Sequence, residues 1–197
     1  MVKAADIPIG IKSFLSLKRY KILGVRRKRP LVMGVLNTSP DSFSNGSNFS
    51  KNHDVLKYLE KMVNDGIDII DIGGESTKPG FETISPDLEI NRIAEVLKVL
   101  RKDHPNLVVS VDTRKSQVAE YALSRGVKIF NDVSSLNYDR DSFKVAKKFG
   151  SYVCLMHNSG AGKDLHQKIL GKDFLLDIFD HLRERIQFAE LNGISRT

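Results

Sequence analysis

The sequence is poor in cysteine, lacks tryptophan and contains no long apolar segment. With one cysteine among 197 residues, the chain cannot form an internal disulfide, which excludes a disulfide scaffold and indicates a reducing compartment, the cytoplasm. No apolar run approaches the length that spans a bilayer, so the sequence predicts a soluble protein with no membrane partner. Cys154 lies in the apolar run SYVCLMH, and we expect it to be a buried small hydrophobe rather than a nucleophile.

Acidic residues are scarce only at the N-terminal end. Residues 1–30 contain nine basic residues and one acid, a charge of +8, and subtracting this from the total of +7 leaves −1 for residues 31–197. A nearly neutral body without interleaved aromatics argues against specific nucleic-acid binding. The basic arm lacks the apolar core of a secretory signal. A transit peptide, an anion-binding arm and a two-stranded ribbon turning at Gly24 remain open, and we favour the ribbon.

Short β-branched apolar runs alternate with amphipathic helical stretches from Pro30 onward. The runs span residues 31–36, 67–71, 107–111, 127–130 and 151–156. Helices are expected within residues 52–66, 85–103, 116–126, 141–150 and 172–193, with Ser85 as a cap, Pro86 in the first turn and glycines at several ends. This alternation predicts a parallel sheet, because parallel strands need crossovers. An open doubly wound sheet and a (β/α)8 barrel both satisfy it.

Polar side chains stand at the carboxyl end of every apolar run. They are Asn37, Asp71, Asp112, the pair Asn131 and Asp132, and His157. Any one of them could cap a helix or start a turn. Together they predict one shared cavity, because ligands bind at the carboxyl ends of parallel strands. Amides, carboxylates and an imidazole suit a polar heterocycle, and the oxygens suit a hard cation such as Mg²⁺.

Two long loops follow the first two runs. The first, NTSPDSFSNGSNFS, is rich in Ser, Asn and Gly, and loops of this length are uncommon unless they act as functional lids. In the second, GGESTKPGFETIS, the glycines would let the backbone approach a ligand, and Ser76, Thr77 and Lys78 could bind a phosphate. A solvated turn is the alternative for this loop. The motif GxGxxG is absent, so neither loop is a dinucleotide fingerprint.

Five motifs resemble those of bacterial dihydropteroate synthases, the targets of sulfonamides. They are VMGVLNTSPDSFSNG, IDIIDIGGESTKPG, VSVDT, IFNDVS and LMH, and the resemblance runs from about Leu31 to the end of the chain. It implies a (β/α)8 TIM barrel of which about five strand–helix units are present, with residues 1–30 as a basic arm or hairpin and 31–197 as an incomplete pterin-binding domain. It also implies a transferase of folate biosynthesis, which condenses 6-hydroxymethyl-7,8-dihydropterin diphosphate with 4-aminobenzoate to dihydropteroate and pyrophosphate.

The resemblance implies roles for residues at the strand ends. Asn37 is expected to bind Mg²⁺ and the diphosphate. Asp112 and Asn131 are expected to hydrogen-bond the pterin ring, and Met156 to line the pterin cavity. Asp71 is expected to order the site, so that Asn37, Asp71 and Asp112 form the catalytic group.

The two loops are expected to supply the rest of the site. By the same resemblance, Phe43, Thr77 and Pro79 wall the aminobenzoate pocket, and Ser76 and Thr77 lie near the diphosphate. The implied reaction is a dissociative displacement, in which departure of the diphosphate needs charge neutralisation by a metal and hydrogen-bond donors. No nucleophilic Ser or Cys is required.

Four positions depart from the family motifs. Asn45 replaces an Asp, Lys78 an Arg, Ser135 a Gly and Asn158 a Met. A lysine cannot reproduce the planar fork of arginine. Together these departures leave room for a divergent specificity.

The chain is also short for the fold, because a barrel typically needs about 250 residues. It stops at NGISRT, before the strands that in the family carry a pterin-binding Asp, a Lys against the ring and the basic diphosphate ligands. A fragment, a chain completed by another chain and an inactive truncated relative are the interpretations, and we favour the fragment. A complete protein is expected to be a homodimer. A pterin- or folate-binding module without this catalysis is the alternative function, although the presence of both loops argues against it.

Overall fold

A parallel sheet of five strands forms the centre of the computed structural model, which describes residues 21–23, 25–26, 30–39, 51–76, 82–158 and 173–195. The strands are β3 (Met33–Asn37), β4 (Ile69–Gly73), β5 (Val108–Asp112), β6 (Ile129–Asp132) and β7 (Tyr152–Leu155). The helices are α2 (Lys51–Asn64), α3 (Pro86–Asp103), α4 (Ser116–Leu123), α5 (Ser142–Phe149) and α6 (Phe174–Leu191). Every predicted strand and helix is therefore present, with boundaries displaced by a few residues.

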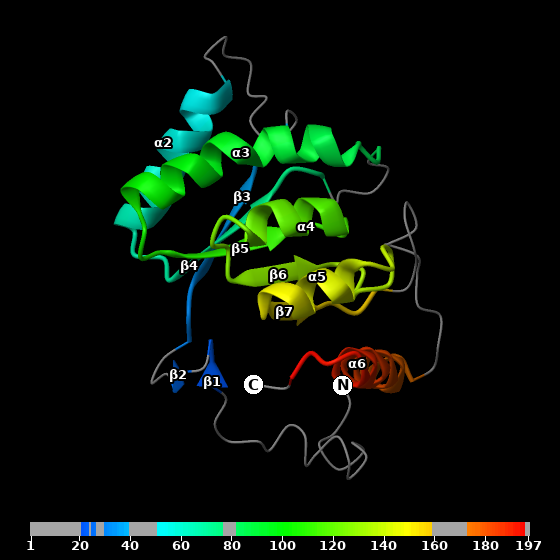
Figure 1. Cartoon of the computed structure of the whole chain (residues 1–197). Coiled ribbons are helices and arrows are strands. Elements are labelled where there is room, and N and C mark those ends of the chain that lie inside the picture. Colours follow the sequence, from blue (N-terminus) through cyan, green and yellow to red (C-terminus); the bar gives the residue numbers. More distant parts are fainter. Residues whose placement is uncertain are drawn as a thin grey trace.

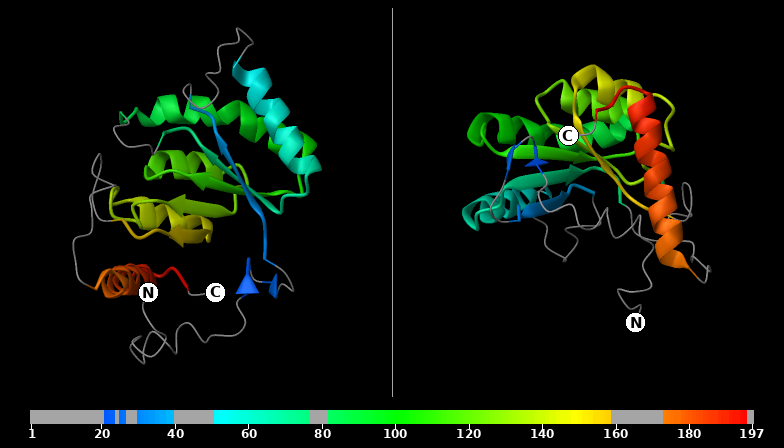
Figure 2. Two further views of the ribbon diagram at one scale, coloured as in Figure 1. Left: turned by 180° about the vertical axis from the view of Figure 1, so that it is seen from behind. Right: turned by 90° about the horizontal axis from the view of Figure 1, so that it is seen from below.

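The strand order identifies the architecture. The strands are hydrogen-bonded as β3-β4-β5-β6-β7, which is also their order along the chain. Helices α3, α4 and α5 lie on the same side of the sheet, in front of it in Figure 1 and behind it in the left view of Figure 2. A doubly wound sheet instead reverses its strand order and carries helices on both faces. The chain thus forms five consecutive units of a (β/α)8 barrel, as its motifs predicted.

Local signals explain where the helices begin and end. The Ser85 hydroxyl accepts a hydrogen bond from Leu88 N at 3.3 Å, and Pro86 follows at the first helical position of α3, so the predicted cap is confirmed. α5 ends where Gly150 adopts φ 58°, a left-handed conformation that favours glycine. These residues set the length of the helices that cover the sheet.

The hydrophobic core lies between the sheet and its helices. Leu36, Ile72, Val111 and Phe130 form one row across four strands, and each side chain is at most 1% exposed. They belong to one buried cluster with residues of the covering helices, including Leu59, Ile93 and Leu97. Burying each such side chain contributes roughly 1.5–3 kcal/mol. The sheet face turned away from these helices, called the inner face below, carries the alternate residues of each strand.

The described part of the basic arm contains a short ribbon. β1 (Lys21–Ile22) and β2 (Val25–Arg26) pair antiparallel around a turn in which Leu23 has φ 54°. This pairing lies where the sequence favoured a ribbon. The boundary at residue 30 remains a prediction, and residues 1–20 lie outside the described part. Among the described helices, none has the length and apolarity that crossing a membrane requires.

Candidate active site at the carboxyl ends of the strands

One row of the inner face brings together three of the predicted polar residues. The strand register places Asn37, Gly73, Asp112, Asn131 and Cys154 side by side across all five strands. Because side chains alternate along a strand, this row faces away from the core row beside it. Asn37, Asp112 and Asn131 therefore gather at the carboxyl end of the sheet, where barrels bind their ligands.

Asp71 lies one row deeper than the sequence predicted. The run IDIID was expected to end at Asp71, but β4 continues to Gly73, and Asp71 pairs in register with Val35 and Ser110. Asn131 Nδ2 donates a hydrogen bond to Asp71 Oδ2 at 2.9 Å. This bond connects the deeper carboxylate with the row above it.

The floor of this site holds polar atoms that lack hydrogen bonds. Asp71 Oδ1 and Ser110 Oγ are buried, and neither reaches hydrogen-bond geometry with another atom of the described residues. Burial raises the pKa of Asp71, and the nearby Ser110 hydroxyl and the Asn131 amide oppose this effect. A buried polar group without a partner costs about 1–3 kcal/mol. Such atoms on the floor of a ligand-binding face suit a ligand with polar edges.

The Asp112 carboxyl has a strongly raised pKa. Burial, followed by the negative charge of Asp71, raises the pKa of this carboxyl to about 8. Without a ligand, most Asp112 side chains therefore carry a proton at neutral pH. A carboxyl perturbed by both burial and a like charge at the ligand-binding end of a barrel is a candidate functional group.

Asn37 ends β3 and starts the first long loop. Its Oδ1 accepts a hydrogen bond from Ser39 N at 2.9 Å, and Thr38 Oγ1 donates to Gly73 O at 3.0 Å. The amide oxygen has a second lone pair that remains for a ligand. The described residues contain no group of three His, Cys, Asp or Glu that could hold a metal ion. Because Mg²⁺ usually takes only one or two protein oxygens together with substrate phosphates and water, Asn37 fits Mg²⁺ as a shared ligand.

The expectation for Cys154 is wrong. The thiol was expected to be buried, but Cys154 is exposed, because its position in β7 directs the side chain to the inner face beside Asn131. Because the residues around Cys154 are apolar, the sequence predicted that both faces of this strand would be buried. Met156, which was expected to line the pterin cavity, follows β7 and is 40% exposed.

His157 and Asp132 do not join the inner-face row. The His157 ring packs edge-on against His181 of α6, with the ring centroids 5.0 Å apart. Asp132 is fully buried, and its carboxylate accepts hydrogen bonds from Ser134 N at 2.7 Å and Leu136 N at 3.0 Å. Asp132 directly follows Asn131 on β6, so its side chain points to the opposite face of the sheet, and His157 lies beyond the end of β7. Of the polar residues expected in one cavity, these two serve packing and loop structure.

The predicted loop residues can be placed only in part. Ser76 follows β4 and is half-buried. Phe43, Thr77 and Pro79, predicted for the aminobenzoate pocket, lie outside the described residues, as do Asn45 and Lys78.

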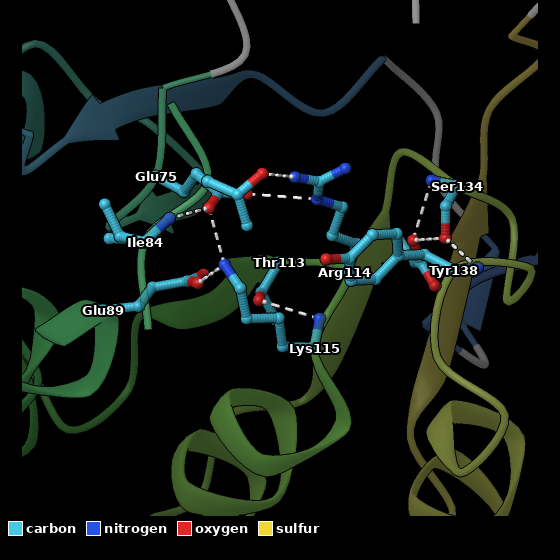
Figure 3. A network of polar contacts seen from close by, with 10 residues as sticks. Glu75, Ile84, Glu89, Thr113, Arg114, Lys115, Ser134 and Tyr138 are labelled. Carbon is cyan, nitrogen blue, oxygen red and sulfur yellow. Dashed lines mark hydrogen bonds and ion pairs between the residues drawn. The ribbon is translucent and has the colours of Figure 1, made fainter. Parts of the chain in front are cut away.

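The sequence interpretation missed a buried ion network beside the site (Figure 3). Lys115 Nζ lies 2.6 Å from Glu75 Oε2 and 2.5 Å from Glu89 Oε2. Arg114 Nε donates to Glu75 Oε1 at 3.1 Å, and Glu75 Oε2 also accepts from Ile84 N at 2.9 Å. The network ties the loop after β4 to the loop after β5. Glu89, only 1% exposed, lies four residues before Ile93 on the apolar stripe of α3, and a charge at that position was the available signal.

Gly74 serves helix packing rather than ligand approach. A Cβ atom at Gly74 would lie 2.8 Å from the backbone oxygen of Glu89, too close for any side chain. Arg92 Nη1 also donates to Gly74 O at 2.8 Å. Gly73 differs, because a Cβ there would make only ordinary contact, 3.5 Å from Cβ of Asp112 on the inner face. The predicted role of the two glycines, to let the backbone approach a ligand, therefore stays a prediction for Gly73 alone.

Two departures from the family motifs have structural explanations. Ser135 has φ 55°, a left-handed conformation that explains why glycine is usual at this position. Its hydroxyl donates to Met156 O at 2.6 Å, and Arg185 Nε donates to Ser135 O at 2.8 Å. Asn158 Nδ2 donates to Val133 O. Both substitutions therefore add contacts between the loops after β6 and β7.

Known proteins are similar to the chain over most of its length. The family model for pterin binding enzymes matches residues 33–197. A dihydropteroate synthase from Clostridium beijerinckii is 38% identical over 167 residues. The structure of Xanthomonas albilineans dihydropteroate synthase with 4-aminobenzoic acid matches with a TM-score of 0.78 and 31% identity. That of the Burkholderia cenocepacia enzyme complexed with 7,8-dihydropteroate matches with a TM-score of 0.74 and 30% identity.

These proteins are longer than the chain. The matches cover 85%, 88% and 87% of this chain but 59%, 61% and 57% of the three proteins, in the order given. The chain thus spans about three-fifths of the relatives that it matches. The family model nevertheless matches the whole sheet and its helices. The chain belongs to the family of pterin-binding enzymes.

Proposed function

We propose that the chain acts in dihydropteroate synthesis, condensing 6-hydroxymethyl-7,8-dihydropterin diphosphate with 4-aminobenzoate and releasing pyrophosphate. The inner-face group of Asn37, Asp112 and Asn131, with Asp71 hydrogen-bonded beneath Asn131, carries this proposal. Similar enzymes bind 4-aminobenzoic acid and 7,8-dihydropteroate, which supports both substrates. The single cysteine is compatible with a cytoplasmic enzyme, and we expect the complete protein to be a homodimer.

The pterin ring would lie on the inner face. Its ring and exocyclic N–H groups would donate to the Asp112 carboxylate, and Asn131 offers both a donor and an acceptor. Such donors favour the ionised carboxylate, whereas burial and Asp71 hold the pKa of Asp112 at about 8 in the free protein. Binding of a pterin at neutral pH should therefore release a proton from Asp112.

The diphosphate would lie at the strand ends near Asn37 and Ser76. Mg²⁺ held there would neutralise charge on the leaving group. The carbon–oxygen bond to the diphosphate breaks, a carbon–nitrogen bond to the aminobenzoate amine forms, and the amine loses a proton. Asp71 and Asp112 supply negative potential beside the pterin as positive charge develops on it.

A pterin-binding module without catalysis is the second candidate. It shares the inner-face group of Asn37, Asp112 and Asn131 with the first candidate, because a pterin could bind there without reacting. Pyrophosphate release with both substrates and Mg²⁺ separates the candidates, since a binding module would bind the pterin without releasing pyrophosphate.

Calorimetry of the variant Asp112→Asn tests the shared pterin site. Titration with 6-hydroxymethyl-7,8-dihydropterin should show affinity lowered at least about tenfold, because the ring would lose a charged acceptor. Repeating the wild-type titration in buffers of different ionisation enthalpy should reveal proton release. Asp65→Asn is the matched control, because Asp65 is exposed and pairs with Lys61 on α2. Unchanged affinity in Asp112→Asn would refute the pterin site.

A further inference from the structure

A groove with basic walls opens on the outer surface between α3 and α4. It encloses about 620 Å³ and carries four cations, Lys98, Arg101, Lys102 and Arg125, against one acid, Glu95. The local charge is therefore +3. Because residues 31–197 together carry −1, the rest of this body carries −4, so the groove is a local concentration of positive charge.

The groove lies at the opposite end of the sheet from the pterin site. Arg101 belongs to the last turn of α3, and Arg125 follows the C-terminal end of α4. Arg101 Nη1 contacts Gly126 O, three residues before β6 begins. Helices of a barrel run antiparallel to its strands, so helix C-termini lie where strands begin. A ligand in this groove would not compete with one on the inner face.

One edge of the Arg101 guanidinium has no hydrogen-bond partner. Nη1 makes a long contact of 3.5 Å with Gly126 O, but Nε and Nη2 are buried and have no partner among the described residues. Burial lowers the pKa of Arg101, and no carboxylate offsets this effect. Nε and Nη2 form the side of the guanidinium that binds two oxygens of an anion in parallel.

Helix electrostatics do not explain this edge. Cations at helix C-termini stabilise the helix dipole, which accounts for Lys102 and for Arg125, whose Nη1 donates to Tyr121 O at 3.0 Å. They do not account for two buried N–H groups left without acceptors among the described residues, an arrangement that destabilises the folded chain. An interaction with the helix dipole requires only a positive charge near the helix end. It does not require Nε and Nη2 to lack hydrogen-bond acceptors.

We propose that this groove binds a small phosphate-bearing anion, with Arg101 Nε and Nη2 donating to two phosphate oxygens. Lys98 and Lys102 are exposed and line the same groove, where their charges would neutralise the remaining charge of the anion. Because Nε and Nη2 are closed to bulk water, entry of the anion displaces neighbouring side chains, and pairing of the two donors offsets this cost. The charge of +3 favours a dianion over a carboxylate or chloride.

Nuclear magnetic resonance of the arginine Nε–H groups tests this site in the intact chain. Titration with inorganic phosphate at constant ionic strength should shift the Arg101 Nε–H signal saturably. Acetate, the carboxylate probe, should shift it at least tenfold less effectively. Arg101→Lys keeps the charge but removes the fork, and phosphate affinity should fall at least tenfold. Arg183→Gln is the control, because Arg183 on α6 is 60% exposed and lies outside the groove, and its affinity should match the wild type.

Several results would overturn the proposal. They are an Arg101 signal that does not respond to phosphate, equal responses to phosphate and acetate, and undiminished phosphate affinity in Arg101→Lys. If Arg101→Lys fails to fold, the response of the wild-type Arg101 Nε–H signal to phosphate and acetate still tests the proposal. Phosphate binding that persists in Asp112→Asn supports a site separate from the pterin site, so the two proposals can fail independently.

Discussion

Asp112, a candidate functional residue, should weaken the protein that contains it. Its pKa is about 8 in the folded chain, whereas an unfolded Asp titrates near 3.9. The folded state thus binds more protons than the unfolded state between these values, and stability falls as pH rises from about 4 to about 8. A carboxyl placed only for packing would not carry this penalty. The penalty is expected where a ligand supplies the missing donors.

The variant Asp112→Asn should therefore be more stable than the wild type at alkaline pH. We expect its Tm at pH 8 to exceed that of the wild type by at least about 3 °C, which corresponds to about 1 kcal/mol for a chain of this size. At pH 4 most of the difference should disappear, because the folded-state carboxyl is then neutral and the unfolded one, with a pKa near 3.9, is only about half ionised. Thermal unfolding followed by circular dichroism measures both values.

The same variant should lose pterin affinity, so a gain in stability with a loss of binding would identify Asp112 as functional. Asp65→Asn, at an exposed position, should show no such pH dependence. A Tm difference of equal size at pH 4 and pH 8 would contradict the raised pKa.

Hydrophobic pattern alone located the elements, but not the row of the sheet on which each residue lies. The five apolar runs coincide with β3 to β7, since their β-branched residues are those that pack under helices. A two-residue error at the end of β4 was enough to move Asp71 one row deeper. Cys154 shows the related limit, because an apolar run does not reveal which alternate residues face a site. Register comes from pairing between strands, which a single sequence does not contain.

The ion network between β4, α3 and β5 should contribute strongly to stability. In Lys115→Met, Glu75 keeps its ion pair with Arg114, but the carboxylate of Glu89, which is only 1% exposed, loses the lysine with which it pairs. Removing one partner of a buried pair typically costs roughly 3–5 kcal/mol, because the other charge stays buried. We expect a loss of that size in urea unfolding. Glu89→Gln added to Lys115→Met should recover part of it.

Lys148→Met is the matched control for this experiment. Lys148 pairs with Glu120 at 2.6 Å, but both side chains are about half exposed or more, at 62% and 46%. Exposed pairs contribute about 0–1 kcal/mol. If Lys115→Met costs no more than Lys148→Met, the network does not hold the two loops together energetically.

At the scale of the whole molecule, helices cover one face of the sheet, whereas the inner face is buried at Asp71 and Ser110 but exposed along β3. The helix side buries the core row completely, whereas Val35 is 64% exposed and Met33 37% exposed on the inner face of β3. The resemblance predicted an incomplete barrel, and five units of a barrel cannot close on themselves. The fold class was therefore predictable from motifs, while the exposure of particular side chains required the coordinates.

The exposed apolar side chains of β3 on the inner face predict that the 197-residue polypeptide self-associates. Exposed apolar side chains on a strand with an unpaired edge promote association, and an inward-pointing charge opposes it. Val35→Lys should therefore shift the polypeptide toward the monomer in sedimentation velocity at micromolar concentration, and should lower its binding of a hydrophobic dye. Leu191→Lys is the control, because Leu191 is 88% exposed but lies at the end of α6, away from the inner face. Equal effects of the two variants, or a wild-type chain that stays monomeric and binds no dye, would mean that the inner face is not the surface that drives association.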